Sequence, residues 1–272
     1  MDANQLETPF GTDEPDEIHL TEAPLARVIA QLRFPALSAM AGGSSTQDFV
    51  GQLSTEYPFI NEGSEVLPAF IQADLANASP QPTLSPVWQV RSSDENWFVS
   101  LGKGGLSLET TKYTSRAEFT ARFARAANVF FDIFQVQRFE RFGIRYINRV
   151  DNPDILPRIP KLVRPEFAGT SVLKVPAGTT LHHEILESQY DRGHSTTLVR
   201  CGYLPPQSTI DLAVPPASGP SWILDIDSAI TDTSRISVEA IQGLTDELFG
   251  YNYHFFRYAV SSEFLKLFGA QL

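Results

Sequence analysis

The chain has 272 residues and a mass of 30.2 kDa, enough for one large domain or two small ones with proper cores. Its formal net charge of −11 opposes non-specific binding to nucleic-acid backbones and anionic membranes. Cys201 is the only cysteine, which excludes an intrachain disulfide and a zinc site built from cysteines of this chain. We expect a cytoplasmic protein, because the sequence shows neither an export signal nor an apolar run of about 18 residues.

The first residues are acidic and include no Lys or Arg. The carboxylates between residues 2 and 22 are Asp2, Glu7, Asp13, Glu14, Asp16, Glu17 and Glu22. Such a composition predicts a disordered acidic arm over residues 1–23. A solvated leader is the simpler interpretation, and an arm that reaches a basic partner is the alternative.

Residues 24–150 predict strands that lead into an amphipathic helix. Alternating apolar and polar residues indicate strands at 25–34, 87–92, 97–102, 105–111 and 139–150. Thr46 is placed to cap a short helix. Ser115 and Glu118 match a capping box, and phenylalanines and alanines then recur at helical spacing up to Phe134.

Residues 151–272 repeat this order after a proline-rich stretch at 151–180. Strands are predicted at 180–188, 196–204 and 221–229, and one long helix or two consecutive helices follow from Ser237. We therefore predict an α+β fold of largely antiparallel sheet with long amphipathic helices packed on one face. Its two similar sheet-and-helix halves are 24–150 and 151–272.

Four phrases of the sequence resemble a known family. They are Ala30 to Pro35 (AQLRFP), Leu106 to Thr110 (LSLET) with Tyr113 after it, Phe142 to Asn148 (FGIRYIN) and Trp222 to Asp227 (WILDID). Together they resemble the uncharacterised bacterial proteins described as sporadically distributed. The resemblance implies no activity, substrate or cofactor for any residue, and it suggests an accessory role in a bacterial defence or toxin–antitoxin locus.

Three arginines form the strongest candidate site. Arg141, Arg145 and Arg149 lie at every fourth position of the predicted strand 139–150, so their side chains share the face opposite its apolar residues. Guanidinium groups in such a row suit a phosphate or carboxylate ligand. The structural alternative is cross-strand pairing with carboxylates such as Glu109 or Glu184.

Asn148 lies on the same predicted strand, but the alternation sends its side chain to the apolar face. A buried amide needs hydrogen-bond partners, so we expect Asn148 to fix a turn or a contact between the halves.

A second group of polar residues has the chemistry of metal ligands. Asp225 and Asp227 share one face of a predicted strand, and His182 and Glu184 share a face of another. These four residues are metal-site candidates for a metal-assisted hydrolase or nuclease. A polar outer face explains the same pattern, and we predict no cofactor.

The sequence thus favours a non-catalytic recognition or regulatory module over an enzyme. Its expected ligand is a protein partner or a small anion held by Arg141, Arg145, Arg149 and Asn148, and self-association is a further option. The first alternative is the metal-assisted hydrolase or nuclease. The second is an RNA- or DNA-binding protein, which the net charge opposes.

Overall fold

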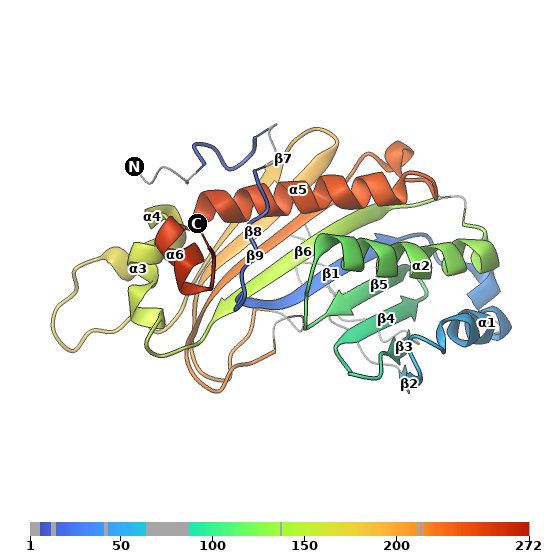
Figure 1. Cartoon of the computed structure of the whole chain (residues 1–272), viewed down its shortest axis with the longest axis horizontal. Coiled ribbons are helices and arrows are strands. Elements are labelled where there is room, and N and C mark those ends of the chain that lie inside the picture. The colour runs from blue at the N-terminus through green and yellow to red at the C-terminus, as the bar shows by residue number, and fades with distance from the viewer. Residues whose placement is uncertain are drawn as a thin grey trace.

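The computed structural model shows a nine-stranded antiparallel sheet with helices lying across it (Figure 1). It describes residues 6–11, 15–40, 43–63, 87–136, 138–210, 213 and 215–271. The α+β class and the antiparallel sheet are confirmed. The connection between residues 64 and 86 lies outside the described residues.

The strands are β1 (Leu25–Arg33), β2 (Phe59–Gly63), β3 (Val87–Arg91), β4 (Trp97–Gly102), β5 (Gly105–Thr110), β6 (Arg141–Val150), β7 (Glu184–Asp191), β8 (Ser195–Leu204) and β9 (Ser221–Ile230). The α-helices are α1 (Ser44–Leu53), α2 (Arg116–Phe134), α3 (Ile159–Leu162), α4 (Pro165–Ala168), α5 (Ile241–Ala259) and α6 (Ser262–Leu267). Short 3-10 helices occupy Ser38–Met40, Leu156–Arg158, Gly169–Val172 and Thr233–Arg235.

The strand order is β2-β3-β4-β5-β1-β6-β9-β8-β7, so β1 and β6 form the centre of the sheet. They pair antiparallel, with Ala30 opposite Ile144 and Val28 opposite Tyr146. The register shifts between Leu25 and Arg27, so that Leu25 pairs with Asn148 and Arg27 with Ile147. Strand β5 flanks β1 and strand β9 flanks β6, which brings together segments far apart in the chain.

Two helices of 19 residues each, α2 and α5, contact the sheet. Phe123 of α2 stacks on Phe142 of β6 at 5.4 Å between ring centroids, and Phe249 of α5 lies 5.5 Å from Tyr146. Phe142 and Tyr146 share one face of β6, because side chains alternate along a strand. The arginines of β6 therefore project from the opposite face.

The start of α2 follows the capping box that the sequence predicts. Ser115 has an extended backbone, and its hydroxyl accepts a hydrogen bond from the Glu118 amide at 3.2 Å. The Glu118 carboxylate also receives the Thr114 hydroxyl and the Arg122 guanidinium. These contacts satisfy amides and charges that a helix start otherwise leaves to water.

The structure ends α5 at Ala259 and begins α6 at Ser262, so two helices close the described chain. Val260 is extended, and the Ser261 hydroxyl caps α6 by accepting the Phe264 amide. The strand predicted at 180–188 is wrong at its start. Strand β7 begins at Glu184, whose carboxylate accepts the Thr170 amide at 2.9 Å, and residues 180–183 lie outside the strand.

The described part of the predicted acidic arm, residues 6–11 and 15–23, makes contacts with the rest of the fold. The Ile18 amide donates to the Tyr253 hydroxyl at 2.7 Å, and the Glu22 amide donates to the Phe268 carbonyl at 3.1 Å. The apolar side chains Phe10, Ile18 and Leu20 pack against the core cluster that contains α5. Partial burial of these three apolar side chains offsets part of the entropy that is lost when this acidic segment becomes ordered.

Candidate functional site

The arginine row lies on the predicted face of β6, but each of its members has a partner within the chain. Arg145 is 8% exposed and holds Asp225 with two hydrogen bonds of 2.8 and 2.7 Å. Arg141 donates to Asp227 at 2.7 Å. Arg149 donates to the Pro215 carbonyl at 2.6 Å. Cross-strand pairing thus accounts for Arg141 and Arg145, but with Asp227 and Asp225 of β9 as partners. The expected partners lie elsewhere, because Glu109 pairs with Arg27 and Glu184 accepts the Thr170 amide.

Asp225 connects two strands of this charge network. It lies on β9, is 1% exposed, and also receives Arg200 of β8 at 3.4 Å. Arg200 in turn donates to Glu187 of β7 at 2.6 Å. A related pair on the same face joins Arg27 to Glu109 at 3.0 Å. The network balances charge between strands, so the row offers no ready anion site.

The four metal candidates are not brought together. Asp225 and Asp227 are ion-paired with arginines on the face away from α2 and α5. Glu184 lies on the opposite face, because β7 and β8 align Glu187 with Arg200 on the Asp225 face. His182 precedes β7 and lines a separate cavity of about 580 Å³. Within the described residues, no three His, Cys, Asp or Glu side chains are grouped to hold a metal ion.

Asn148 is 2% exposed on the apolar face, as the alternation predicts. Its amide donates to the Leu224 carbonyl at 3.1 Å, which gives this buried group a partner on β9. Its side chain also lines a cavity of about 440 Å³ between the sheet and the N-terminal segment. Asn148 therefore belongs to a different candidate site from the three arginines.

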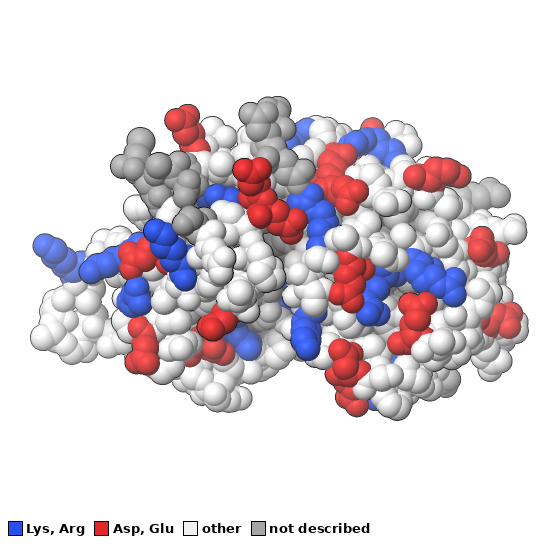
Figure 2. Space-filling view, viewed as in Figure 1, with Lys and Arg blue, Asp and Glu red and all other residues white. Residues whose placement is uncertain are grey.

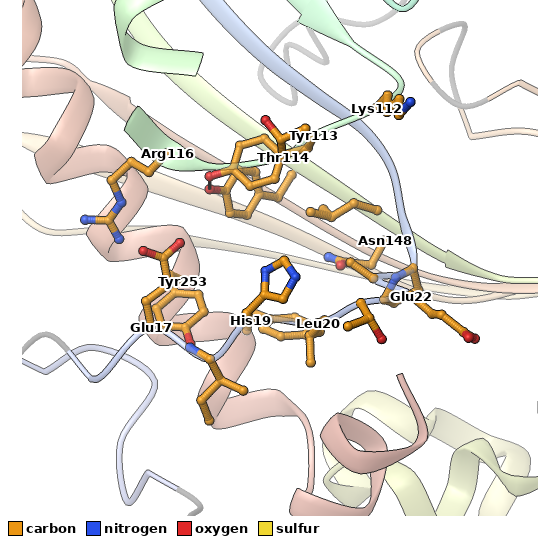
Figure 3. A pocket seen from close by; sticks show the side chains of 17 residues that line it. Glu17, His19, Leu20, Glu22, Lys112, Tyr113, Thr114, Arg116, Asn148 and Tyr253 are labelled. Atoms are coloured by element: carbon orange, nitrogen blue, oxygen red, sulfur yellow. Dashed lines mark hydrogen bonds between the residues drawn. The ribbon is translucent and has the colours of Figure 1, made fainter. Parts of the chain in front are cut away.

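This cavity, the strap pocket, has residues 17–25 as one wall and the sheet with α2 and α5 as the other (Figure 3). Figure 3 shows the His19 ring pointing into it, with Arg116 and Lys112 on opposite sides of the view. The lining residues beyond 17–25 are Lys112, Tyr113, Thr114, Arg116, Tyr146, Asn148, Tyr253 and Phe256.

Two phenols meet at the strap pocket. The Tyr146 hydroxyl donates to the Tyr113 hydroxyl at 3.3 Å, which leaves the Tyr113 proton directed to no acceptor among the described residues. Burial raises the pKa of Tyr113 to about 12 and raises the pKa of Tyr146 well above its ordinary value. Both phenols stay protonated near neutral pH, so they serve as hydrogen-bond donors rather than bases.

Two basic residues line the strap pocket near the start of α2. Arg116 is the first residue of α2, and Lys112 is exposed in the turn before it. A helix start carries positive partial charge, because its first amides have no partner within the helix. Glu17 and Glu22 are exposed, but the Glu17 carboxylate faces the strap pocket, and its negative charge adds to burial in raising the pKa of Tyr113 and Tyr146. The strap pocket thus combines basic groups and the Tyr113 phenol with the Glu17 carboxylate.

Side chains of α5 hold the N-terminal wall of the strap pocket through hydrogen bonds to its backbone. Tyr253 donates its hydroxyl to the Asp16 carbonyl at 3.1 Å and accepts the Ile18 amide, and Arg257 donates to the Asp16 carbonyl at 3.1 Å. Each contact uses the main chain of the segment. The side chains of Glu17 and His19 are therefore left to face the strap pocket.

The raised pKa of Tyr113 predicts how the stability of the fold changes at alkaline pH. Burial raises the pKa of Tyr113 to about 12, against a pKa of about 10 for tyrosine in the unfolded chain. Above pH ~10 the folded state therefore binds more protons than the unfolded state. The contribution of Tyr113 to the free energy of unfolding is fully present below that pH and is lost as the pH rises toward 12. Tyrosinate absorbance of the folded protein should show late-ionising tyrosines, and Tyr113→Phe should reduce their number by one while Tyr146 remains. Ionisation of all tyrosines near pH 10 in the folded protein would contradict this assignment.

Charge on the helix-bearing face is mixed. Figure 2 shows Lys and Arg side chains interspersed with Asp and Glu over this face, and its described residues form no broad basic surface there. No helix in the described part of the chain is long and apolar enough to cross a membrane.

Sequence reasoning missed Tyr113, Arg116 and His19 as pocket residues. In the sequence, Tyr113 stands out only as the residue after the Leu106–Thr110 phrase, and His19 is a lone histidine in an acidic segment. The usable signal was Asn148, a polar residue placed on an apolar strand face. No known protein-family model matches the chain, and no curated protein matches it at the level that indicates common descent.

Proposed function

We propose that this protein is a non-catalytic recognition module that binds a small anionic ligand in the strap pocket. The observation that carries the proposal is a cavity of about 440 Å³ lined by the Tyr113 phenol and by the basic residues Lys112 and Arg116 near the start of α2. This volume falls in the usual range for small-molecule sites, about 300 to 1,000 Å³.

The donors favour an anion over a neutral ligand. Tyr113 keeps its proton near neutral pH, and a hydrogen bond from a phenol to a charged acceptor is stronger than one to a neutral acceptor. The start of α2 adds positive partial charge, and Lys112 adds a full charge at the rim. A carboxylate or phosphate group of the ligand fits this end of the strap pocket.

The same features support binding without catalysis. A general base needs a pKa near the working pH, and burial moves both phenols away from it. Asn148 is engaged with the Leu224 carbonyl, which fixes its side chain as a positioning group.

A thermal-shift panel of small carboxylates and phosphates, each paired with its neutral amide or alcohol, tests the proposal. A ligand present at about 100 times its Kd should stabilise the fold by about 2.7 kcal/mol, which raises Tm by roughly 5–10 °C for a chain of this size. The neutral analogues should give much smaller shifts. Equal shifts for the charged and neutral members of each pair would overturn the anionic assignment.

The remaining expectations are also proposals. Two similar sheet-and-helix halves are supported by the strand order, in which β1 with β5-β4-β3 and β6 with β9-β8-β7 follow the same pattern. This pattern favours a boundary between α2 and β6 over the expected halves 24–150 and 151–272, because β6 (Arg141–Val150) begins the second series of strands. The 19-residue helices α2 and α5 end the two patterns and contact one face of β6. The cytoplasmic location rests on composition, and the accessory role in a defence or toxin–antitoxin locus rests on the family resemblance.

A further inference from the structure

We propose that the outer edge of β7 binds an extended segment of a partner protein with alternating basic and apolar residues, which joins the sheet as a further strand. This inference is independent of the strap pocket. Strand β7 ends the sheet order, and the β7–β8 hairpin projects past α5 in Figure 1.

The backbone of β7 is available for pairing. In an antiparallel ladder, every second residue directs its N–H and C=O away from the neighbouring strand. No backbone hydrogen bond joins the outward groups of β7 to another described segment. The strand has eight residues without proline or lysine, which are the usual means of blocking an edge. The opposite edge, β2, has five residues and continues into residues that the structure does not describe.

The side chains of β7 present two different faces. Leu186 and Tyr190, on the helix side, are 41% and 37% exposed. Glu187, Gln189 and Asp191 alternate with them and project to the other side. An added strand would therefore place apolar residues beside Leu186 and Tyr190, and basic residues beside the carboxylates.

The negative charge of β7 favours a different protein over a second copy of this chain as its partner. Strand β7 contains Glu184, Glu187 and Asp191 and no basic residue. Two copies paired antiparallel about Gln189 would put Glu187 opposite Asp191 on the same face, and like charges at opposite positions destabilise a ladder. The net charge of −11 adds repulsion between copies and attraction for a basic segment.

Gln189 allows a direct test, because it is exposed and lies between the two carboxylates on its face. The probe is a labelled peptide of the length of β7 that alternates lysine and valine, and binding is measured by fluorescence anisotropy. Gln189→Lys should weaken binding about two- to fivefold, and Gln189→Glu should strengthen it by a similar factor. Gln52→Lys on α1 changes the net charge equally at an exposed site elsewhere, and it should match the unmodified protein.

Backbone pairing is tested with peptides N-methylated at alternate residues, in both registers. Methylation in one register should reduce binding at least about tenfold, because it removes the donors that face β7. Three results would overturn the proposal. They are no binding of the lysine–valine peptide, equal weakening by Gln189→Lys and Gln52→Lys, or undiminished binding of both methylated peptides. Self-association that Leu186→Lys abolishes would also overturn it, since the edge would then serve a second copy.

Discussion

Replacing Asp225 with alanine is expected to lower the free energy of unfolding by about 3–5 kcal/mol, because it leaves a buried guanidinium without its carboxylate. Arg145 is 8% exposed and makes two hydrogen bonds to Asp225, so water cannot easily replace the lost partner. Arg200 loses the same acceptor. Urea denaturation followed by circular dichroism measures the change.

Asp227→Ala is the matched control for Asp225→Ala. Asp227 lies two residues further along β9 and accepts Arg141, but the two side chains are 23% and 19% exposed. Partly exposed ion pairs contribute about 0–1 kcal/mol, so this variant should remain close to the unmodified protein. If the two variants lost the same free energy of unfolding, burial would not explain the contribution of the Arg145–Asp225 pair to stability.

Trp222→Ala is expected to cost about 3–5 kcal/mol, mainly through the cavity that it leaves. The Trp222 side chain is fully buried on the helix side of β9, in the core cluster that contains α4, α6 and part of α5. Its indole donates to the Phe167 carbonyl at 3.1 Å, and its ring meets Phe264 at 6.5 Å between centroids. Chemical denaturation measures the loss.

Trp222→Phe separates packing from hydrogen bonding. It keeps most of the ring volume and removes the donor to the Phe167 carbonyl. Leaving that acceptor unsatisfied should cost about 1–3 kcal/mol, less than the alanine variant. A loss under about 1 kcal/mol for Trp222→Ala would contradict the assignment of Trp222 to the core.

Local signals carried most of the fold prediction. The capping box at Ser115 and Glu118 predicted the start of α2, because it depends only on residues three positions apart. Alternation along 139–150 placed the arginines and Phe142 on opposite faces of β6. The start of β7 was missed because a contact from Glu184 to the Thr170 amide, across 14 residues, sets it.

The partners of the arginine row could not be read from the sequence. Asp225 and Asp227 were assigned as metal candidates, yet they are the carboxylates that hold Arg145 and Arg141. Pairing β6 with β9 brings residues 80 positions apart into contact, and a single sequence does not specify that register.

The strap pocket was missed for a related reason. It combines the segment before β1, the turn before α2 and the C-terminal third of α5, and only the assembled fold brings these together. The acidic composition of the N-terminal segment favoured a disordered arm. Its few apolar residues, Phe10, Ile18 and Leu20, were the signal that it packs against the fold.

The most direct test of the central claim is calorimetric titration of the anion that gives the largest thermal shift. Lys112→Glu, at the strap pocket, and Tyr113→Phe are each expected to weaken binding about tenfold, roughly the loss of one charge-assisted contact. Lys103→Glu, in the turn between β4 and β5, makes the same charge change away from the strap pocket and should leave Kd unchanged. Equal Kd values for Lys112→Glu and Lys103→Glu, with no effect of Tyr113→Phe, would contradict a ligand site in the strap pocket.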